Sequence, residues 1–209
     1  MLIFDIETVR IEGQMYIWEF ACVDTNTFLQ ANFINKNTID IVRELQGVVD
    51  IQFYGKKQDD YVNKNAHKMV NQAYFKKVIQ RIFDGYKVIA AYNINFDQKH
   101  LTDFGVNFKG TRTVCLWGSF AEAYVTSKYI KWALENQFVT EKGNIKTDAE
   151  TAYKYITKDM DYEHLHFALA DCYSEAVIWN GIKKRKGKTY STTSYNDIKK
   201  IIRKYEKRC

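Results

Sequence analysis

The sequence has no proline, so its turns must rely on glycine, asparagine and aspartate, and slow prolyl isomerisation cannot limit folding. It has four cysteines, and no two of them form a C-x-x-C pair. That absence argues against a zinc ribbon or a thioredoxin-like site. Scattered cysteines favour reduced thiols, and we therefore expect a cytoplasmic protein.

Long hydrophobic runs are also missing. The longest apolar stretches, such as residues 88–92, are far too short to cross a bilayer. The first residues lack the basic region and long apolar segment of a signal peptide, and an acid already stands at position 5. We therefore expect neither a membrane anchor nor a membrane partner.

What is present is typical of a globular protein of one domain: 209 residues, 46% of them hydrophobic and 27% charged. The net charge of +6 is uneven, because residues 183–209 hold 11 Lys/Arg and 2 Asp/Glu, a balance of +9 that leaves −3 for residues 1–182. We expect a domain at 1–182 and a basic linker and helix at 183–209, packed on the same domain. The basic tail either binds phosphate groups or is simply a solvated helix.

Apolar and β-branched patterns predict five strands, at residues 2–8, 15–23, 27–34, 87–92 and 111–117. Helical patterns fall at residues 37–45, 63–83, 95–104, 119–124, 127–136, 147–156, 162–184 and 194–207, with 50–62 left as a loop or short strand. Thr147 to Glu150 has the form of a capping box. This order predicts an α/β fold with a mixed five-stranded sheet flanked by helices.

Two acids stand inside the first predicted strand. Asp5 and Glu7 are two residues apart, so their side chains point to the same face of the strand. Their neighbours in the strand are apolar, and burying two acids there is costly unless a metal or hydrogen bonds compensate. The pair therefore indicates a metal site, with a solvent-facing acidic pair as the alternative.

A third acid follows the fourth predicted strand. Asp97 lies in the first turn of the helix at 95–104, after the typical capping residues Asn93 and Asn95. Taken alone, Asp97 is best interpreted as an acid that complements the helix dipole.

The predicted helix at 162–184 carries a histidine and a fourth acid. On an ideal helix, the directions of His166 and Asp171 differ by about 140°. A histidine in the first turn or preceding loop could still reach a metal-bound water, and its ordinary pKa suits a general base. His164 is a nearby rival, and a structural role is the alternative for either histidine. We expect Glu175 to lie on the helix surface.

These residue types suit the cleavage of a phosphodiester. Two divalent ions about 3.5–4 Å apart can activate water, stabilise charge on the phosphate and assist the leaving alkoxide. Mg²⁺ prefers carboxylate and water oxygens as ligands. Such a centre needs acids gathered from separate strands and helices, which is what the sequence offers.

Three short motifs carry a resemblance. Residues 4–8 read FDIET, residues 93–97 read NINFD, and residues 166–171 read HFALAD. In this order they resemble the motifs of the DEDDh exonucleases, the DnaQ-like 3′–5′ exonuclease family, and the resemblance covers about residues 1–180. The histidine five residues before the aspartate is that of the DEDDh branch. The resemblance implies a ribonuclease H-like fold, which periodicity alone does not select among mixed α/β folds.

The resemblance also implies roles for these residues. The metal ligands for two Mg²⁺ or Mn²⁺ ions would be Asp5, Glu7, Asp97 and Asp171. His166 would be the general base, while Glu7 and the backbone near Thr8 would meet the terminal 3′-hydroxyl. The product would be a nucleoside 5′-monophosphate released from a 3′ end.

Further substrate contacts are expected outside the ligand set. Asn93 and Phe96 belong to the second motif, and Phe96 is a candidate for stacking on an unpaired base. The basic residues Lys183, Lys184 and Arg185 could hold phosphates upstream of the scissile bond.

Three functions stay open from the sequence. The first is a 3′–5′ exonuclease on single-stranded DNA or mismatched ends, and the second is an RNA 3′-end trimmer or oligoribonuclease, since sugar choice depends on contacts to the 2′-hydroxyl. The third is a nucleic-acid-binding module that does not cut. The 209 residues show no polymerase domain, so a role in proofreading or DNA repair would involve either a polymerase or another replication or repair protein as a partner, or a free-standing enzyme.

Overall fold

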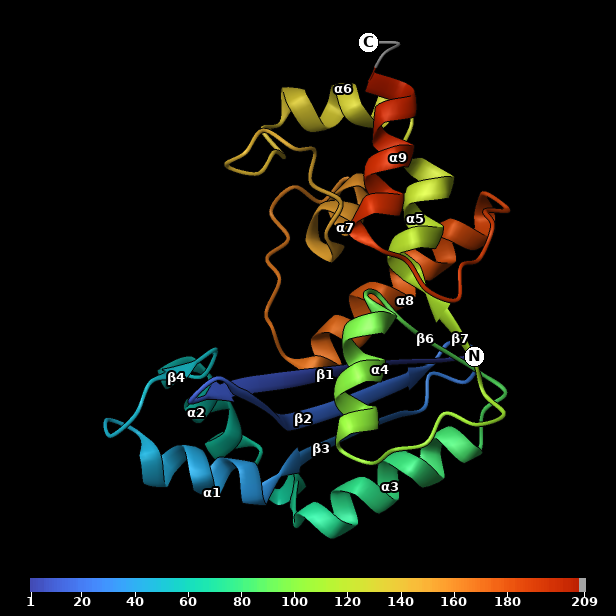
Figure 1. The fold of residues 1–209 in the computed structure, drawn as a ribbon. Helices are drawn as coiled ribbons and strands as arrows, with labels where there is room; N and C mark the ends of the chain where they lie inside the picture. Colours follow the sequence, from blue (N-terminus) through green and yellow to red (C-terminus); the bar gives the residue numbers. More distant parts are fainter. Residues whose placement is uncertain (207–209) are drawn as a thin grey trace.

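The computed structural model describes residues 1–206 and has a mixed β-sheet at its centre (Figure 1). The strands are β1 (Leu2–Ile11), β2 (Gln14–Asp24), β3 (Gln30–Asn35), β4 (Ile51–Gln52), β5 (Met69–Val70), β6 (Val88–Ala91) and β7 (Arg112–Cys115). Their order is β5-β3-β2-β1-β6-β7, with β4 paired to β1. The five predicted strands are therefore confirmed, and the two-residue strands β4 and β5 are added to them.

The direction of the strands follows from the length of the connections. β1, β2 and β3 form an antiparallel meander joined by short turns. β6 and β7 run parallel to β1, and helices make the connections between them. This is the mixed α/β architecture that the sequence predicts, and it is consistent with a ribonuclease H-like fold.

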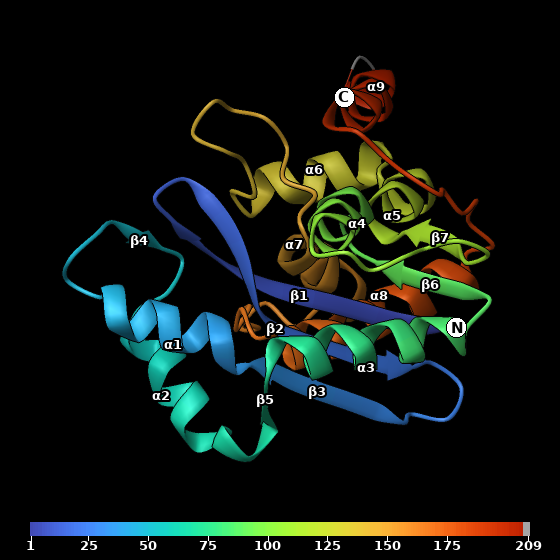
Figure 2. The same cartoon turned by 60° about the horizontal axis from the view of Figure 1, so that its bottom comes forward.

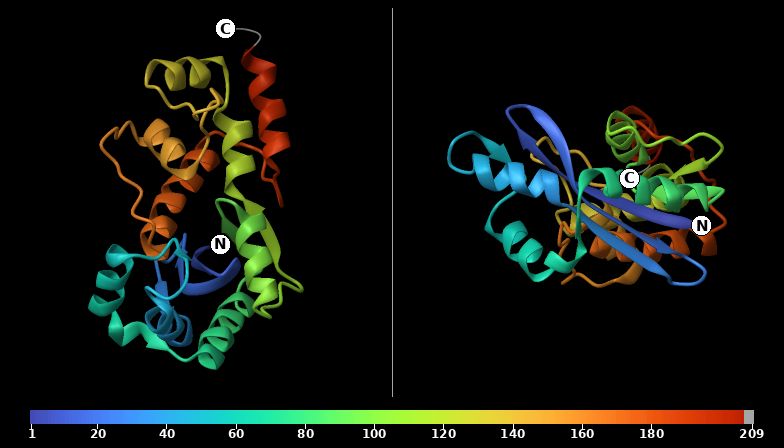
Figure 3. Two further views of the ribbon diagram at one scale, coloured as in Figure 1. Left: turned by 60° about the vertical axis from the view of Figure 1, so that its left-hand side comes forward. Right: turned by 90° about the horizontal axis from the view of Figure 1, so that it is seen from below.

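Helices cover the sheet and extend beyond it. They are α1 (Lys36–Leu45), α2 (Lys56–Lys64), α3 (Gln72–Asp84), α4 (Ile94–Asp103), α5 (Leu116–Tyr124), α6 (Ser127–Glu135), α7 (Ala149–Thr157), α8 (Ala168–Lys184) and α9 (Tyr195–Glu206). Figures 1 and 3 show α1, α2 and α3 at one end of the molecule and α5, α6, α7 and α9 at the other. Among residues 1–206, no helix is both long enough and apolar enough to span a membrane.

The alternation of β1 decides which side chains reach which layer. Phe4 and Ile6 join the apolar cluster on the α3 side of the sheet, together with Phe75 of α3. Ile3 joins the cluster that contains Ala168 and other residues of α8. Figure 2 shows α3 and α8 on opposite sides of the strands. Because successive side chains alternate, the acids at positions 5 and 7 face α8.

The chain between β3 and β6 differs from the prediction. The single helix expected at 63–83 is two helices, since α2 ends at Lys64 and α3 begins at Gln72. α2 also occupies much of the segment 50–62. The break is stabilised by Asn71, whose side chain accepts a hydrogen bond of 2.9 Å from the Tyr74 N–H and so caps α3.

Two other boundaries shift. α8 begins at Ala168, so the predicted helix at 162–184 starts six residues too early and His166 lies in the preceding loop. The cap of α7 is Asp148 rather than Thr147, because the Asp148 carboxylate accepts the Thr151 N–H at 2.8 Å.

The C-terminal segment packs on the helical end of the molecule. Ile198 and Ile202 of α9 are buried in the same apolar cluster as residues of α5 and α6. The stretch before α9 lies along β7, where the Cys115 N–H donates to the Tyr190 carbonyl oxygen. This stretch is therefore a packed connection rather than a free linker.

The β1–β2 pairing contains one irregularity. Glu7 lies opposite Glu19 and Thr8 lies opposite Ile17, which leaves Trp18 as an extra residue in β2. Such a β-bulge bends the strand and changes the direction of the side chains beside it. Here it stands next to the acids of β1.

Candidate metal centre

Three carboxylates meet where β1 passes under α8. Asp5 and Glu7 come from β1 and Asp171 from the first turn of α8, and each offers an oxygen within 4.8 Å of the others. Asp171 is buried at 3% exposure because this side of α8 faces the sheet. The structure thus brings three of the four acids predicted as metal ligands into one group.

The fourth predicted ligand, Asp97, reaches the same place from α4. β6 runs parallel to β1, and its connection places the first turn of α4 beside β1. The Asp97 side chain is buried at 4% exposure and interacts with the backbone N–H of Ile6. Burial raises the pKa of Asp97 to about 7, although that N–H lowers it.

A fifth acid, Glu175, joins the cluster, so the prediction that it lies on the helix surface is wrong. It is buried at 3% exposure and lies one turn beyond Asp171 on α8. Residues four apart share a helix face, so the burial of Asp171 implies that of Glu175. Sequence reasoning could have found it from this spacing.

Burial and repulsion from neighbouring acids raise the pKa of Asp5, Glu7 and Glu175. Burial is the largest cause for Asp5, followed by repulsion from Asp97, Glu175, Glu7 and Asp171, and it holds the pKa of Asp5 well above its ordinary value. Burial and the neighbouring Asp171 raise the pKa of Glu7 to about 9. Five carboxylates in one buried place cannot all be ionised unless cations compensate their charge.

An unpartnered oxygen indicates what the cluster can hold. Glu175 Oε2 is buried and accepts no hydrogen bond, while Asp171 Oδ1 contacts only the imidazole of His164. Buried carboxylate oxygens normally have a partner, and each exception calls for an explanation. A hard divalent ion such as Mg²⁺ or Mn²⁺ prefers oxygen ligands of this kind, so the residues fit such ions.

Two histidines of the loop before α8 lie beside Asp171. His164 is partly buried, and its Nε2 is 2.9 Å from Asp171 Oδ1. Burial lowers the pKa of His164, but the Asp171 carboxylate raises it, and the net direction is upward. His166 is exposed, and partial desolvation together with neighbouring His164 lowers its pKa. His166 is therefore the neutral imidazole of the pair near pH 7.

A cavity of about 440 Å³ opens next to the acids. Its lining comes from β1, β2, α2 and the loop before it, α4 and the loop before α8: Ile6, Glu7, Thr8, Arg10, Met15, Phe53, Gln58, Phe96 and His166. Four predicted site residues, Glu7, Thr8, Phe96 and His166, thus share one cavity. Phe53, which is 63% exposed, also lines it and was not predicted, because it stands in a segment without a clear pattern.

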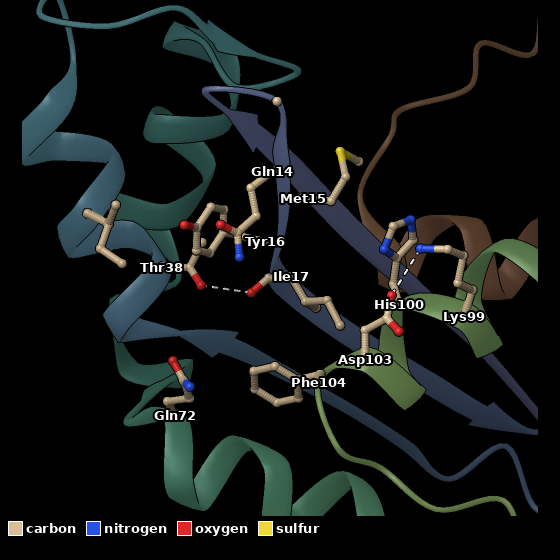
Figure 4. Close-up of a pocket in the computed structure, with 12 residues that line it drawn as sticks. Gln14, Met15, Tyr16, Ile17, Thr38, Gln72, Lys99, His100, Asp103 and Phe104 are labelled. Atoms are coloured by element: carbon tan, nitrogen blue, oxygen red, sulfur yellow. Dashed lines mark hydrogen bonds and ion pairs between the residues drawn. The ribbon is translucent and has the colours of Figure 1, made fainter.

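A second cavity of about 450 Å³ shares Met15 with the first (Figure 4). Its lining includes Lys99, His100 and Asp103 of α4. Lys99 and Asp103 form an exposed ion pair of 2.9 Å with each other. Neither of the two groups among residues 1–206 that could hold a metal ion lies in this second cavity.

A buried acid of β2, Glu19, holds the start of α8. Its Oε2 accepts the Ala168 N–H at 3.0 Å, and its Oε1 accepts the Tyr61 hydroxyl of α2 at 2.6 Å. The Tyr61 ring stacks on Phe167 with 4.0 Å between centroids. Burial raises the pKa of Glu19, although its two donors lower it. This residue was missed, and an acid within the apolar strand 15–23 was the available signal.

Some predicted contacts lie elsewhere. Lys183 and Lys184 end α8 and Arg185 follows it, about 20 Å from Asp171 at 1.5 Å per residue. Arg185 lies over the Tyr124 ring and Lys183 over the Trp179 ring. They do not join the acids, and upstream phosphate binding stays a prediction. Asn93 is exposed at the start of α4 and does not line the cavity.

Compared with known proteins, the chain matches no family model, no curated protein and no solved structure. What can be inferred about function therefore comes from the residues of the centre and from the motifs that carry the resemblance.

Proposed function

We propose that the chain is a metal-dependent 3′–5′ exonuclease of the DEDDh type, which hydrolyses phosphodiester bonds at the 3′ end of nucleic acid. The observation that carries this proposal is the meeting of Asp5, Glu7, Asp97 and Asp171 beside an open cavity that His166 lines. Acids from β1, α4 and α8 converge there although they are far apart in the sequence.

The four acids of the motifs would hold two Mg²⁺ or Mn²⁺ ions, with Glu175 as a further buried acid close to Asp97 and Asp171. When bound, the ions supply charge stabilisation at the phosphate and a more acidic water. The chain supplies the fixed carboxylates. Because burial and mutual repulsion disfavour their ionised forms, a bound cation that compensates the charge would stabilise them.

His166 would act as the general base. Its pKa is lowered, so the imidazole is neutral near pH 7 and can accept a proton from water at a ring nitrogen. Its exposed position in the cavity wall gives it access to a water beside the substrate. His164 is less suited, because its pKa is raised and it is directed to Asp171.

The cavity suits the terminal nucleoside. Phe53 and Phe96 offer aromatic faces for a base, and Glu7 with Thr8 offers polar groups for the sugar. Cleavage of the bond behind this nucleoside would release a nucleoside 5′-monophosphate. We favour single-stranded DNA as the substrate, with proofreading or DNA repair beside a partner polymerase as the wider role.

The test is a time course on DNA and RNA oligomers labelled at the 3′ or the 5′ end, with Mg²⁺ or Mn²⁺. The proposal expects stepwise shortening from the 3′ end and release of 5′-monophosphates by the wild-type chain, but not by Asp5→Asn. The DNA and RNA arms decide the sugar preference. A wild-type chain that binds the oligomers but cuts no faster than Asp5→Asn would leave a binding module only.

A further inference from the structure

Two imidazoles converge on one carboxylate at the start of α8. His164 Nε2 lies 2.9 Å from Asp171 Oδ1, and the Nδ1 atoms of His164 and His166 are 3.2 Å apart. The two rings are nearly perpendicular, with 4.4 Å between their centroids. One donor atom from each of the three residues lies within 4.8 Å of the other two.

Hydrogen bonding accounts for only part of this arrangement. His164 Nε2 is at hydrogen-bonding distance from Asp171 Oδ1, but the Nδ1 atoms of the two rings face each other, and at most one proton can lie between them. The Asp171 side chain is only 5% exposed, so its Oδ1 is hidden from bulk water. Two imidazoles and a buried carboxylate that converge within 4.8 Å of one another offer a set of ligands for a metal ion.

The loop that presents the histidines is held by contacts of its own. His166 has a φ of 55°, in the left-handed region that residues other than glycine seldom adopt. Lys57 of α2 donates to the Leu165 carbonyl oxygen at 2.9 Å, and Tyr61 stacks on Phe167. The neighbours of His166 therefore fix a backbone conformation that carries strain.

We propose that His164, His166 and Asp171 form a second metal site, selective for Zn²⁺ and distinct from the carboxylate centre. Zn²⁺ takes imidazole nitrogen and carboxylate oxygen in a tetrahedral set, and three protein ligands leave one position for water. Mg²⁺ prefers oxygen and is bound mainly through carboxylates, as Asp5 and Glu7 offer. The two sites differ in chemistry although they share Asp171.

Sharing Asp171 makes the two sites compete. Zn²⁺ on this set would take Asp171 from the carboxylate centre and occupy the ring of His166. Zinc bound at the loop before α8 would thus inhibit hydrolysis, and this consequence rests on the proposed nuclease function. Zinc binding itself does not, because it needs neither substrate nor hydrolysis.

The binding test uses the full chain freed of metal, titrated with Zn²⁺ against a chromophoric chelator. His164→Asn should weaken zinc binding about tenfold or more, because it removes a direct ligand. His67→Asn changes an exposed histidine outside the site and should bind zinc as the wild type does. Glu7→Gln, which weakens the carboxylate centre, should also retain zinc. Equal zinc affinity in wild type and His164→Asn would overturn the proposal.

A second measurement needs no variant. The chain has four histidines, so their imidazole signals can be followed by NMR during the zinc titration. Signals of His164 and His166 should shift at low zinc, while those of His67 and His100 stay in place. Movement of all four together, or of none, would contradict a defined site.

The inhibition test then measures, for each chain at fixed Mg²⁺, the zinc concentration that halves the rate of oligonucleotide hydrolysis relative to the zinc-free rate of that same chain. These concentrations are compared between the wild type and the variants. His164→Asn should require about tenfold more zinc than the wild type or His67→Asn. If no hydrolysis occurs in any chain, the proposed nuclease fails while the binding titration still decides the zinc site. Zinc binding without a difference in inhibition would refute the competition for Asp171.

Discussion

The two ends of α8 carry opposite charges and have opposite environments. Asp171 and Glu175 stand near its N-terminal end, buried against the sheet with other acids. Lys183 and Lys184 stand at its C-terminal end, exposed to solvent. Both ends complement the helix dipole, which favours acids at the start and bases at the end. The helix itself therefore explains the sign of the charges at each end, but not their burial.

The difference lies in what the rest of the chain brings to each end. At the N-terminal end, β1, β2, α2 and α4 all supply groups that fix or face the acids. At the C-terminal end the charged groups rest on single aromatic rings such as Tyr124 and Trp179. A buried charged cluster must be organised by tertiary structure, whereas an exposed one can function without fixed positions.

The sharpest contrast is expected from Asp171→Asn. Removing one shared carboxylate of the centre should lower the rate of hydrolysis by about 10³-fold or more. The control is Asp103→Asn, an exposed acid on α4 whose loss should leave the rate near that of the wild type. Rates are measured with excess oligonucleotide at saturating Mn²⁺. An Asp171→Asn rate within about tenfold of the wild type would show that the acidic end is not the reacting centre.

The next effect is that of His166→Asn, which should lower the rate by about 10²-fold. Because the pKa of His166 is lowered, the wild-type rate should rise with pH with a midpoint below the ordinary value of 6.5 and then level off. This limb of the pH profile should be absent in His166→Asn and present in His67→Asn. A limb that persists in His166→Asn would assign the base to another group.

The stability of the metal-free chain should depend on pH through the acidic end. The pKa of Glu7 is about 9 in the folded chain against an ordinary 4.5, so between these values the folded chain holds more protons than the unfolded one. The free energy of unfolding therefore falls as pH rises through this window, by about 1.4 kcal/mol per pH unit for each extra proton. Urea unfolding at several pH values measures it, and Mg²⁺ or Mn²⁺ should reduce the fall.

The same series in Glu7→Gln isolates the contribution of this carboxylate, and its pH slope should be flatter than that of the wild type. Alanine at Lys183 and Lys184, at the opposite end of α8, should leave the slope unchanged. Equal slopes in wild type and Glu7→Gln would contradict the burial of an uncompensated acid here.

A smaller loss is expected from Glu19→Gln. The amide can still accept from the Tyr61 hydroxyl, but its NH₂ faces the Ala168 N–H, so one buried hydrogen bond is broken at a cost of about 1–3 kcal/mol. Hydrogen exchange at residues 165–168 should become faster. If exchange accelerates equally throughout α8, Glu19 stabilises the helix as a whole rather than its start.

The smallest effect should come from the basic end. Alanine at Lys183, Lys184 and Arg185 should weaken the binding of single-stranded DNA, with kcat unchanged. The salt slope should fall by about 0.7 for each phosphate that the variant no longer neutralises. The matched control replaces three exposed basic residues of α3, Lys76, Lys77 and Arg81, by alanine. Equal salt slopes in both triple variants would leave the tail as a solvated surface.

The sequence predicts the parts of the fold that depend on local pattern. Strand periodicity locates the five main strands, and the spacing of Asp5 and Glu7 correctly places both on one face of β1. Asp97 and Asp171 join them as the motifs imply, since each follows a strand or loop that the fold brings beside β1. That these residues hold metal stays a prediction.

What escaped prediction depends on contacts between distant segments. α8 begins at Ala168 because Glu19, 149 residues earlier, accepts its N–H, and no helical pattern reports such a contact. Helix α2 was missed because few of its residues are apolar, although Val62 anchors it in the core. Glu175 was assigned to the surface because an acid within a helix is normally solvated, whereas here it faces other carboxylates.

The extra residue in β2 has a consequence for how this chain can vary. In a regular strand Trp18 and Glu19 would point to opposite sides, yet both reach Tyr61, one with its ring and the other with its carboxylate. Deleting one residue here would restore even pairing but turn one of these two side chains away from Tyr61. Insertions and deletions should therefore be tolerated at the exposed turn of residues 25–29 and rejected between Ile17 and Glu19, even though neither stretch contains a metal ligand.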